Sequence, residues 1–525
     1  MFAKTIELID NQIYIDGENL QINSIVKKIF IEDPKKYLGL NYLPPVLEIT
    51  KSSWKITTSN TNWPLVAVLR KKNHLIVTTD VSIFRREVSN FNSINEKMLW
   101  SYVFFGGCIN SLWLLKDVFV VAPGVVFNIN INGCVVSQKE LIQTSSINKN
   151  LKVQHLPSIF IESTVKILKN LLKYKRPLCL GVSGGVDSRI VLALSDKANL
   201  PISCFLIGRK KGRFGLYTQD YLSSVEISKI YGRKIQVINP RNTSLDDRIS
   251  KDVNTMPMCG SEFGRLANLS FEDSSILLNG GWGFWVQKPS LNLNFKEIVL
   301  KSKSYFNIRK RYHLIDRAFS RIFGLKVTPL DVARKLSNKV YFSLNSVISK
   351  FESGHHHLSL EEKVDVWSHQ ITGGTISSGV FESHGNSMPP LSIYEEYFSK
   401  NPNLRGEYNS HIDRKFLLSV LNLINPELVD IPGQGGRVFT RGARFSKFKV
   451  VARQAIVGHG VMNYKDDFDS KDIQPYLIRV KGLLRYLGSD LNVDQLWRLT
   501  CSGRISPAIL SNLIKSSILL RHVFE

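Results

Sequence analysis

The sequence predicts an α/β protein in which a smaller, strand-rich region precedes a parallel-sheet domain with a helical C-terminal part. Three observations lead to this fold class. The first 150 residues contain short β-rich runs separated by turns, residues 158–238 alternate apolar strands with helical stretches, and the last 220 or so residues have the pattern of helices joined by basic loops. Alternation of strands and helices is typical of a parallel sheet with crossover helices.

In the strand-rich region, the runs 65–69 and 74–79 predict two strands on either side of a polar turn. A helix is expected over Ile94–Phe105, with Ser93 as its N-cap. The polar residues 138–150 predict a linker that ends this region.

Beyond the linker, helices and apolar strands are expected in turn. The predicted elements are a helix over 158–174, a strand over 178–182, a helix over 188–196, a strand over 202–208, a helix over 219–231 and a strand over 234–238. Alternating short apolar strands and helices predict a parallel α/β sheet.

Composition limits the class of protein. The 525 residues include 69 Lys and Arg against 44 Asp and Glu, so the formal net charge is +25, which favours an acidic partner, an anionic substrate or a polyanion. Six scattered cysteines without a C-x-x-C pair argue against a disulfide framework and a thiolate zinc site. The sequence has no run of 18 apolar residues and no apolar signal core near its start, so we expect a cytoplasmic protein that does not associate with membranes.

One motif carries most of the chemical information. It is Ser183-Gly184-Gly185-Val186-Asp187-Ser188, between an apolar strand and a helix. A glycine-rich turn in this place presents backbone N–H groups to an anion, and the two glycines allow close approach to phosphate. Ser183 and Ser188 would add hydroxyl donors. Asp187 is compatible with an anion only if Mg²⁺ bridges the carboxylate to phosphate oxygens. The alternative is that the glycine pair only makes a turn.

The same six residues resemble the pyrophosphate loop (PP-loop) of the ATP pyrophosphatases, the adenine nucleotide alpha hydrolase-like group. This group includes asparagine synthetase, β-lactam synthetase, lasso-peptide cyclases, GMP synthetase and tRNA-modifying enzymes. Its members cleave ATP between the α and β phosphates, adenylate a carboxylate or carbonyl, and release pyrophosphate. The resemblance implies that ATP and Mg²⁺ are bound, with pyrophosphate held by Ser183, Gly184, Gly185 and Ser188, the metal held by Asp187, and adenine flanked by Leu206 and Ile207.

The order of regions resembles asparagine synthetase, β-lactam synthetase and lasso-peptide cyclases. Segments 79–84 and 121–126 look like late strands of the Ntn-type glutaminase domain of asparagine synthetase. We therefore expect a degenerate Ntn glutaminase-like α+β domain over 1–150 and an asparagine-synthetase-like ATP pyrophosphatase domain over 151–525. A working glutaminase of this type exposes a cysteine at position 2, which is Phe2 here, so glutamine hydrolysis is not expected.

A second departure concerns the metal. The family has a strand that ends in Ser-Gly-x-Gly-x-Asp-Glu, and the equivalent stretch here is 275–285, in which Gly280 is expected to contact nucleotide. Phe284 and Trp285 stand where the family has its acidic pair. Mg²⁺ would then depend on Asp187, phosphates and water, or on Glu272 or Asp273. The alternative is a glycine-rich strand end that is packed by aromatic side chains.

Two further segments resemble the family's catalytic regions. In 379–391, Glu382 precedes a proline turn and is the candidate for orienting or deprotonating the attacking amine, because nearby phosphate charge would raise the pKa of such a carboxylate. In the basic loop 433–444, Arg437 and Arg441 are candidates for stabilising the transition state, and Lys447 or Lys449 could serve instead. A solvated carboxylate and a solvated basic loop are the alternatives.

The function expected from these residues is an ATP-dependent, AMP-forming carbon-nitrogen ligase. It would join a carboxylate substrate to an amine nucleophile, such as that of a peptide or an amino acid, without glutamine hydrolysis. Two alternatives stay open: a catalytically degenerate family member that acts as a nucleotide-binding or partner protein, and an RNA-modifying PP-loop enzyme, which the net charge of +25 favours. For the ligase, we do not expect nucleic acid as a partner.

Overall fold

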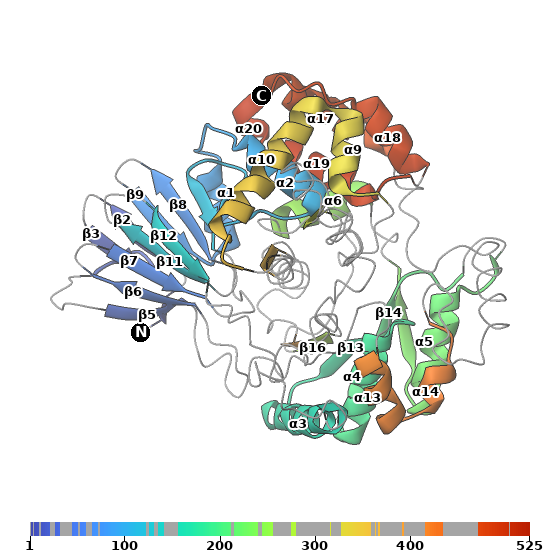
Figure 1. Cartoon of the computed structure of the whole chain (residues 1–525). Helices are drawn as coiled ribbons and strands as arrows, with labels where there is room; N and C mark the ends of the chain where they lie inside the picture. The colour runs from blue at the N-terminus through green and yellow to red at the C-terminus, as the bar shows by residue number, and fades with distance from the viewer. Residues whose placement is uncertain are drawn as a thin grey trace.

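The computed structural model contains two antiparallel sheets near the N-terminus, one parallel sheet in the middle of the chain and a set of helices that ends it (Figure 1). The residues that it describes are 2–3, 5–9, 12–20, 27–31, 45–50, 53–58, 66–71, 74–121, 125–130, 135–140, 156–211, 215–239, 244–255, 275–279, 315–316, 327–358, 363, 366–367, 391–392, 415–433, 471–502 and 504–525.

The N-terminal region is a sandwich of two six-stranded sheets. The first has the order β1 (Phe2–Ala3), β5 (Lys27–Ile31), β6 (Val46–Ile49), β7 (Ser53–Thr57), β11 (Val125–Asn130) and β12 (Val135–Glu140). The second has the order β10 (Val118–Val120), β8 (Ala67–Lys71), β9 (His74–Thr78), β2 (Thr5–Ile9), β3 (Gln12–Ile15) and β4 (Glu18–Leu20). All pairs are antiparallel except β1 with β5.

Successive side chains of a strand point to opposite faces of its sheet, and the apolar ones on the inner faces of both sheets form this sandwich. Trp54 and Ile56 of the first sheet and Val68 and Val77 of the second lie in one buried core between the sheets. The opposite face of the second sheet is also apolar and is covered by α1 (Val81–Val88) and α2 (Glu96–Phe105). The part of the second sheet formed by β8 and β9 is therefore buried on both faces.

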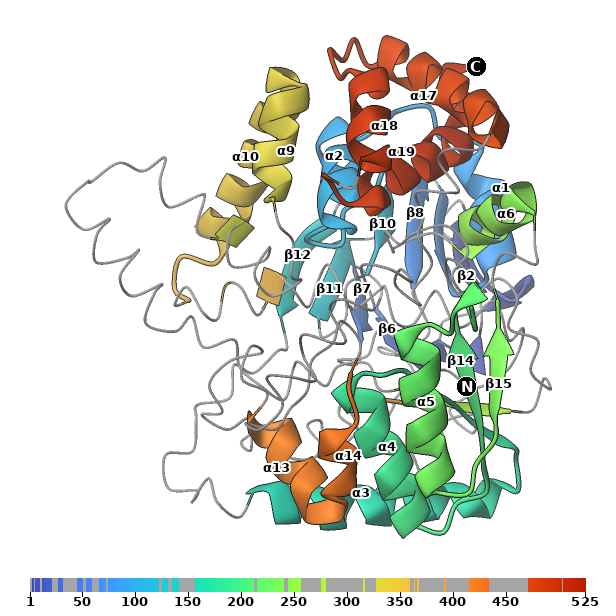
Figure 2. The same cartoon turned by 90° about the vertical axis from the view of Figure 1, so that its right-hand side faces the viewer.

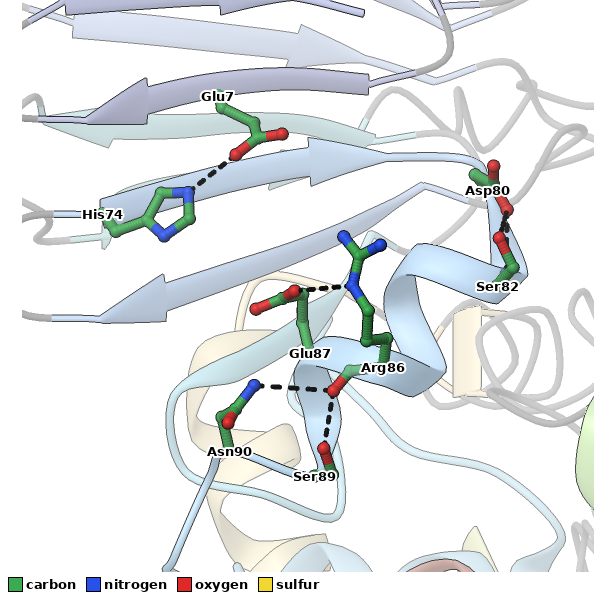
Figure 3. Close-up of polar contacts among 8 residues, drawn as sticks. All are labelled: Glu7, His74, Asp80, Ser82, Arg86, Glu87, Ser89 and Asn90. Atoms are coloured by element: carbon green, nitrogen blue, oxygen red, sulfur yellow. Dashed lines mark hydrogen bonds and ion pairs between the residues drawn. The ribbon is translucent and has the colours of Figure 1, made fainter. Parts of the chain in front are cut away.

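The start of α1 shows why the chain leaves β9 as a helix. The Asp80 carboxylate accepts hydrogen bonds from the backbone N–H of Ser82 at 2.8 Å and from its hydroxyl at 2.6 Å (Figure 3). An aspartate N-cap of this kind satisfies an N–H group that has no partner inside the helix. On the neighbouring strands, the His74 ring nitrogen Nε2 lies 2.9 Å from the Glu7 carboxylate, which links β9 to β2 (Figure 3).

The middle of the chain forms the predicted parallel sheet. Its order is β15 (Ile235–Ile238), β14 (Ile202–Ile207), β13 (Leu178–Gly181), β16 (Ile276–Asn279) and β17 (Leu391–Ser392), and every pair is parallel. The chain runs outward from β13 to β15 and then returns to the other side of β13. The strand order therefore reverses between β13 and β16, and such a point is where ligands bind in open α/β sheets.

Four helices share one core with a single face of this sheet. They are α3 (Leu156–Leu171), α4 (Val186–Lys197), α5 (Gln219–Ile230) and α13 (Lys415–Ile424). Cys179, Phe205 and Leu277 belong to a smaller cluster of buried residues. The short helix α14 (Glu427–Asp430) follows α13 and adds Leu428 and Val429 to the larger core.

A second group of helices shares one core with α1 and α2. They are α9 (Pro329–Leu336), α10 (Asn338–Gly354), α17 (Gln474–Tyr486), α18 (Val493–Cys501), α19 (Pro507–Leu519) and α20 (Arg521–Phe524). The helix α2 lies against both α10 and α19, and its residues from Met98 to Phe105 are all buried (Figures 1 and 2). The helix α6 (Leu245–Thr255), which follows β15, joins the same core. Residues far apart in sequence therefore complete one hydrophobic core.

Several predicted boundaries are corrected by the structure. Residues 81–84, which were expected in a strand, begin α1, because Asp80 caps a helix there. The N-cap of α2 is Asn95 and not Ser93. The helix after the glycine-rich motif starts at Val186 and not at Ser188, and β12 continues to Glu140 inside the predicted linker. The division into domains near residue 150, and the Ntn-like character of the first, stay predictions.

The join between α19 and α2 depends on a polar contact. The Asn512 side-chain amide donates to the carbonyl oxygens of Tyr102 at 3.2 Å and Val103 at 3.4 Å, and Asn512 is 1% exposed. We expect Asn512→Ala to lower the free energy of unfolding by about 1–3 kcal/mol, because it removes a buried donor. Urea unfolding followed by circular dichroism measures this change.

The matched control is Asn90→Ala. Asn90 is exposed and follows the end of α1. Its side-chain nitrogen lies 3.5 Å from the carbonyl oxygen of Arg86 (Figure 3). Its removal should change stability by less than about 0.5 kcal/mol. Equal effects of the two substitutions would contradict the packing of α19 on α2.

Candidate nucleotide-binding site

The candidate site is the turn between β13 and α4, at the carboxyl end of the central strand. Leu180 pairs with Cys204 of β14 and with Leu278 of β16, so both neighbouring strands end beside this turn. The Val182 N–H donates to the Phe205 carbonyl at 2.7 Å and continues the ladder one residue past the strand. The arrowheads of β14 and β15 point toward α6, so this end of the sheet faces the rest of the molecule (Figure 2).

The hydroxyl of Ser188 closes the turn. Its Oγ accepts from the Ser183 backbone N–H at 3.1 Å and lies within donating distance of the carbonyl oxygens of Ser183, at 3.1 Å, and Gly185, at 3.3 Å. The Ser183 hydroxyl in turn accepts from the Gly185 N–H at 3.2 Å. Both hydroxyls therefore shape the turn from within, and their direct contact with phosphate stays a prediction.

The start of α4 has the features of an anion site. Its N-cap is Gly185, in an extended conformation. Glycine has no side chain that could cap the helix. A Cβ atom at Gly185 would lie 3.2 Å from the Ser183 hydroxyl oxygen, so even alanine would crowd the turn. Asp187 lies half-buried in the first turn of α4, which is where the helix dipole stabilises a carboxylate. A carboxylate beside a glycine-rich turn at a helix N-terminus fits a Mg²⁺–phosphate complex.

Leu206 and Ile207, the predicted adenine neighbours, are the last two residues of β14. Since Gly181 pairs with Phe205, these two residues lie alongside the start of the turn, and their contact with adenine stays a prediction. Cys204 precedes them on the same strand, and burial raises the pKa of its thiol to about 11. The Cys204 thiol is therefore neutral at pH 7 and unsuited to act as a nucleophile.

The other predicted site residues, Gly280, Glu382, Arg437 and Arg441, lie outside the described residues. The structure does place chain segments that adjoin them. Asn279 ends β16 next to β13, and Gly280 is the next residue. Leu391–Ser392 forms β17 beside β16, which the sequence did not predict, and brings the segment after Glu382 to this sheet.

Sequence reasoning missed the role of Arg189. This side chain is 0% exposed and donates to the Gly184 carbonyl at 2.9 Å inside the turn. It also reaches the residues that lead into the basic loop with the candidate cations Arg437 and Arg441. The available signal was an arginine in a helix whose neighbouring residues, Val186 and Ile190, are apolar, because such a charge is buried only with dedicated partners.

Within the described ranges, no three His, Cys, Asp or Glu side chains come together in a way that could hold a metal ion. None of the helices described for this chain has both the length and the apolar character needed to cross a bilayer.

Comparisons with known proteins add little. Neither the protein-family models nor the curated protein sequences contain a match to this chain. Among solved structures, the chain is similar to the NMN synthetase from Francisella tularensis, with 11% identity and a TM-score of 0.15, over 47% of this chain and 95% of that one. A TM-score this low does not establish a shared fold.

The closure of the turn can be tested at Ser188. We expect Ser188→Ala to lower the free energy of unfolding by about 1–3 kcal/mol, because the Ser183 N–H loses its acceptor. Ser195→Ala is the control, since Ser195 lies on the same helix, is 1% exposed, and has a hydroxyl without a hydrogen-bond partner in the described structure. Thermal unfolding of both variants gives the difference, and a loss at Ser195 as large as at Ser188 would contradict the proposed closure.

Proposed function

We propose that the turn at 182–185 and the start of α4 bind the phosphates of Mg-ATP, and that the protein is an asparagine-synthetase-like, ATP-dependent amide-forming ligase. In this proposal it adenylates a carboxylate, releases pyrophosphate and transfers the acyl group to an amine. The observation that carries the proposal is a glycine-rich turn, internally hydrogen bonded, at the carboxyl end of the central parallel strand and directly before a helix.

The physical argument starts from charge. The N-terminus of α4 carries partial positive charge, and polyphosphate is stabilised there by backbone N–H groups. The position beside the point where the strand order reverses is the expected place for a nucleotide in an open α/β sheet. Asp187 in the first turn would otherwise repel phosphate, so in this proposal it holds Mg²⁺, which neutralises charge on the phosphates.

The remaining roles are assigned by the sequence resemblance. Glu382 would orient or deprotonate the amine, and Arg437 or Arg441 would stabilise the charge that develops during adenylation and acyl transfer. Support for the basic loop comes from Ile431 and Pro432, whose carbonyls lie 2.7 and 3.1 Å from the guanidinium of Arg189. The basic loop 433–444 therefore begins close to the turn.

In the proposed reaction the nucleophile is a substrate amine, such as that of an amino acid or peptide, and not ammonia released from glutamine.

The proposal predicts magnesium-dependent ATP binding. Asp187→Asn should weaken binding roughly tenfold or more in the presence of Mg²⁺, the size of one lost interaction with a charged group. In EDTA, the variant should bind ATP at least as well as the natural chain, because the carboxylate that repels the phosphates is gone. Isothermal titration calorimetry with and without Mg²⁺ measures both.

Asp331→Asn is the matched control, because Asp331 also lies in the first turn of a helix, α9, and is exposed. It should leave ATP binding unchanged. If the natural chain binds no ATP at millimolar concentration, the ligase proposal fails, and a partner protein derived from such an enzyme becomes the better explanation.

The bond that is cleaved provides a second test. Incubation with Mg-ATP, a panel of carboxylates and a panel of amines should yield AMP and pyrophosphate in equal amounts, detected by chromatography, and no ADP. ADP as the main product would contradict cleavage between the α and β phosphates. A requirement for tRNA, with activity that falls steeply with salt, would favour the RNA-modifying alternative.

A further inference from the structure

Arg189 is a charged side chain without exposure to solvent. It lies in α4 among Val186, Ile190 and Val191, all of which are buried. Removing a cation from water costs several kcal/mol unless hydrogen bonds and nearby dipoles compensate. Such a side chain is therefore stable only in a structure that provides its acceptors in fixed positions.

Both terminal nitrogens of the guanidinium have two carbonyl acceptors each. Nη1 donates to Leu428 at 2.6 Å and Ile431 at 2.7 Å. Nη2 donates to Gly184 at 2.9 Å and Pro432 at 3.1 Å. One planar group thus joins the middle of the turn to residues 428–432, which lie more than two hundred positions later in the chain.

The helix α5 holds the same two segments. The Ser223 hydroxyl donates to the Pro432 carbonyl at 2.5 Å and accepts from the Gln219 side-chain amide at 3.0 Å. The adjacent Ser224 hydroxyl donates to the Val182 carbonyl at 3.0 Å, at the start of the turn. The turn and residues 428–432 are therefore fixed to each other by Arg189 and to α5 by two neighbouring serines.

We propose that Arg189 is a positioning residue that couples the turn to segment 428–432, so that an anion bound at the turn also orders the start of the basic loop. This inference rests on the proposed function only for the identity of the anion. The Gly184 carbonyl belongs to the turn, so a shift of the turn moves an acceptor of Arg189 and is transmitted to Ile431 and Pro432. Coupling of this kind requires a contiguous, rigid set of contacts, which the four hydrogen bonds supply.

Lysine cannot replace this arginine. Its ammonium group is a single nitrogen with three hydrogens and cannot reach the four carbonyls that the planar guanidinium reaches. Arg189→Lys retains the charge and removes the link, and is therefore the variant to test. Arg233→Lys is the matched control, because Arg233 is half-buried in the same domain and donates to the Leu200 carbonyl at 3.1 Å, before the amino end of β14.

The experiment is hydrogen–deuterium exchange with mass spectrometry on the full chain, first without ligand. We expect Arg189→Lys to accelerate exchange about tenfold in peptides that cover 183–188 and 426–433, as the loss of about one net hydrogen bond predicts. Arg233→Lys should leave both peptides as in the natural chain. Unchanged exchange at 426–433 in Arg189→Lys would overturn the proposal, whether or not ATP binds.

The second arm adds Mg-ATP. In the natural chain and in Arg233→Lys, both peptides should become protected, whereas in Arg189→Lys protection should be confined to 183–188. Equal protection of 426–433 in Arg189→Lys would overturn the coupling. Absence of any ATP effect in the natural chain would overturn the proposed function, and the first arm would still decide the role of Arg189.

A second variant, which keeps Arg189, replaces Arg189→Lys in the experiment if that protein does not fold. Ser223→Ala removes one hydrogen bond to Pro432 and leaves the turn untouched. If Arg189→Lys does not fold, Ser223→Ala should still raise exchange at 426–433 several-fold, and at 183–188 to a smaller extent because Arg189 still links the two segments. Exchange like that of the natural chain would show that these polar contacts do not hold the segment, and would overturn the proposal.

Discussion

The central place of β13 in the parallel sheet is the constraint on which the candidate site depends. The strand is hydrogen bonded to β14 on one side and to β16 on the other, so its backbone can continue only until both ladders end. The chain must then turn within a few residues to bring α4 onto the apolar face that α3, α5 and α13 share. Small residues and internal hydroxyl acceptors make so short a turn possible, and the same turn leaves a helix N-terminus at the edge of the sheet.

Buried polar groups under this turn determine the arrangement of its backbone. Arg189, Ser223 and Ser224 are all buried, and each donates to a backbone carbonyl at the edge of the turn or of segment 428–432. Buried hydrogen bonds of this kind contribute little net stability, but an unmade one is costly, so they select a single arrangement of the backbone. The geometry of the turn is therefore determined by residues from α4, α5 and the end of α14 together.

The C-terminal helices show a different kind of long-range dependence. The helix α2 is apolar on all sides, which a surface helix of the N-terminal region could not be. It is covered by α10 and α19, and the Asn512 amide satisfies carbonyls at its end, where Gly106 adopts a left-handed conformation with φ of 86°. The core that α2 shares with these helices is complete only when they are present, so we expect the N-terminal region and these helices to fold cooperatively.

Much of this protein was determined by local sequence. Apolar runs separated by helical stretches were enough to predict the parallel sheet, and the Ser-Gly-Gly-Val-Asp-Ser motif was enough to predict the turn before α4, because turn geometry and strand patterning depend on neighbouring residues. Glu382, Arg437 and Arg441 stay predictions from resemblance.

Only the tertiary structure showed that β17 joins the sheet at Leu391–Ser392, that the last helices cover α2, and that Arg189 holds residues 428–432 against the turn. Two-residue strands, shared cores and buried polar contacts depend on partners far away in the chain. A local sequence pattern does not predict which distant carbonyl or apolar face will contact a given side chain. These contacts are determined by the tertiary fold.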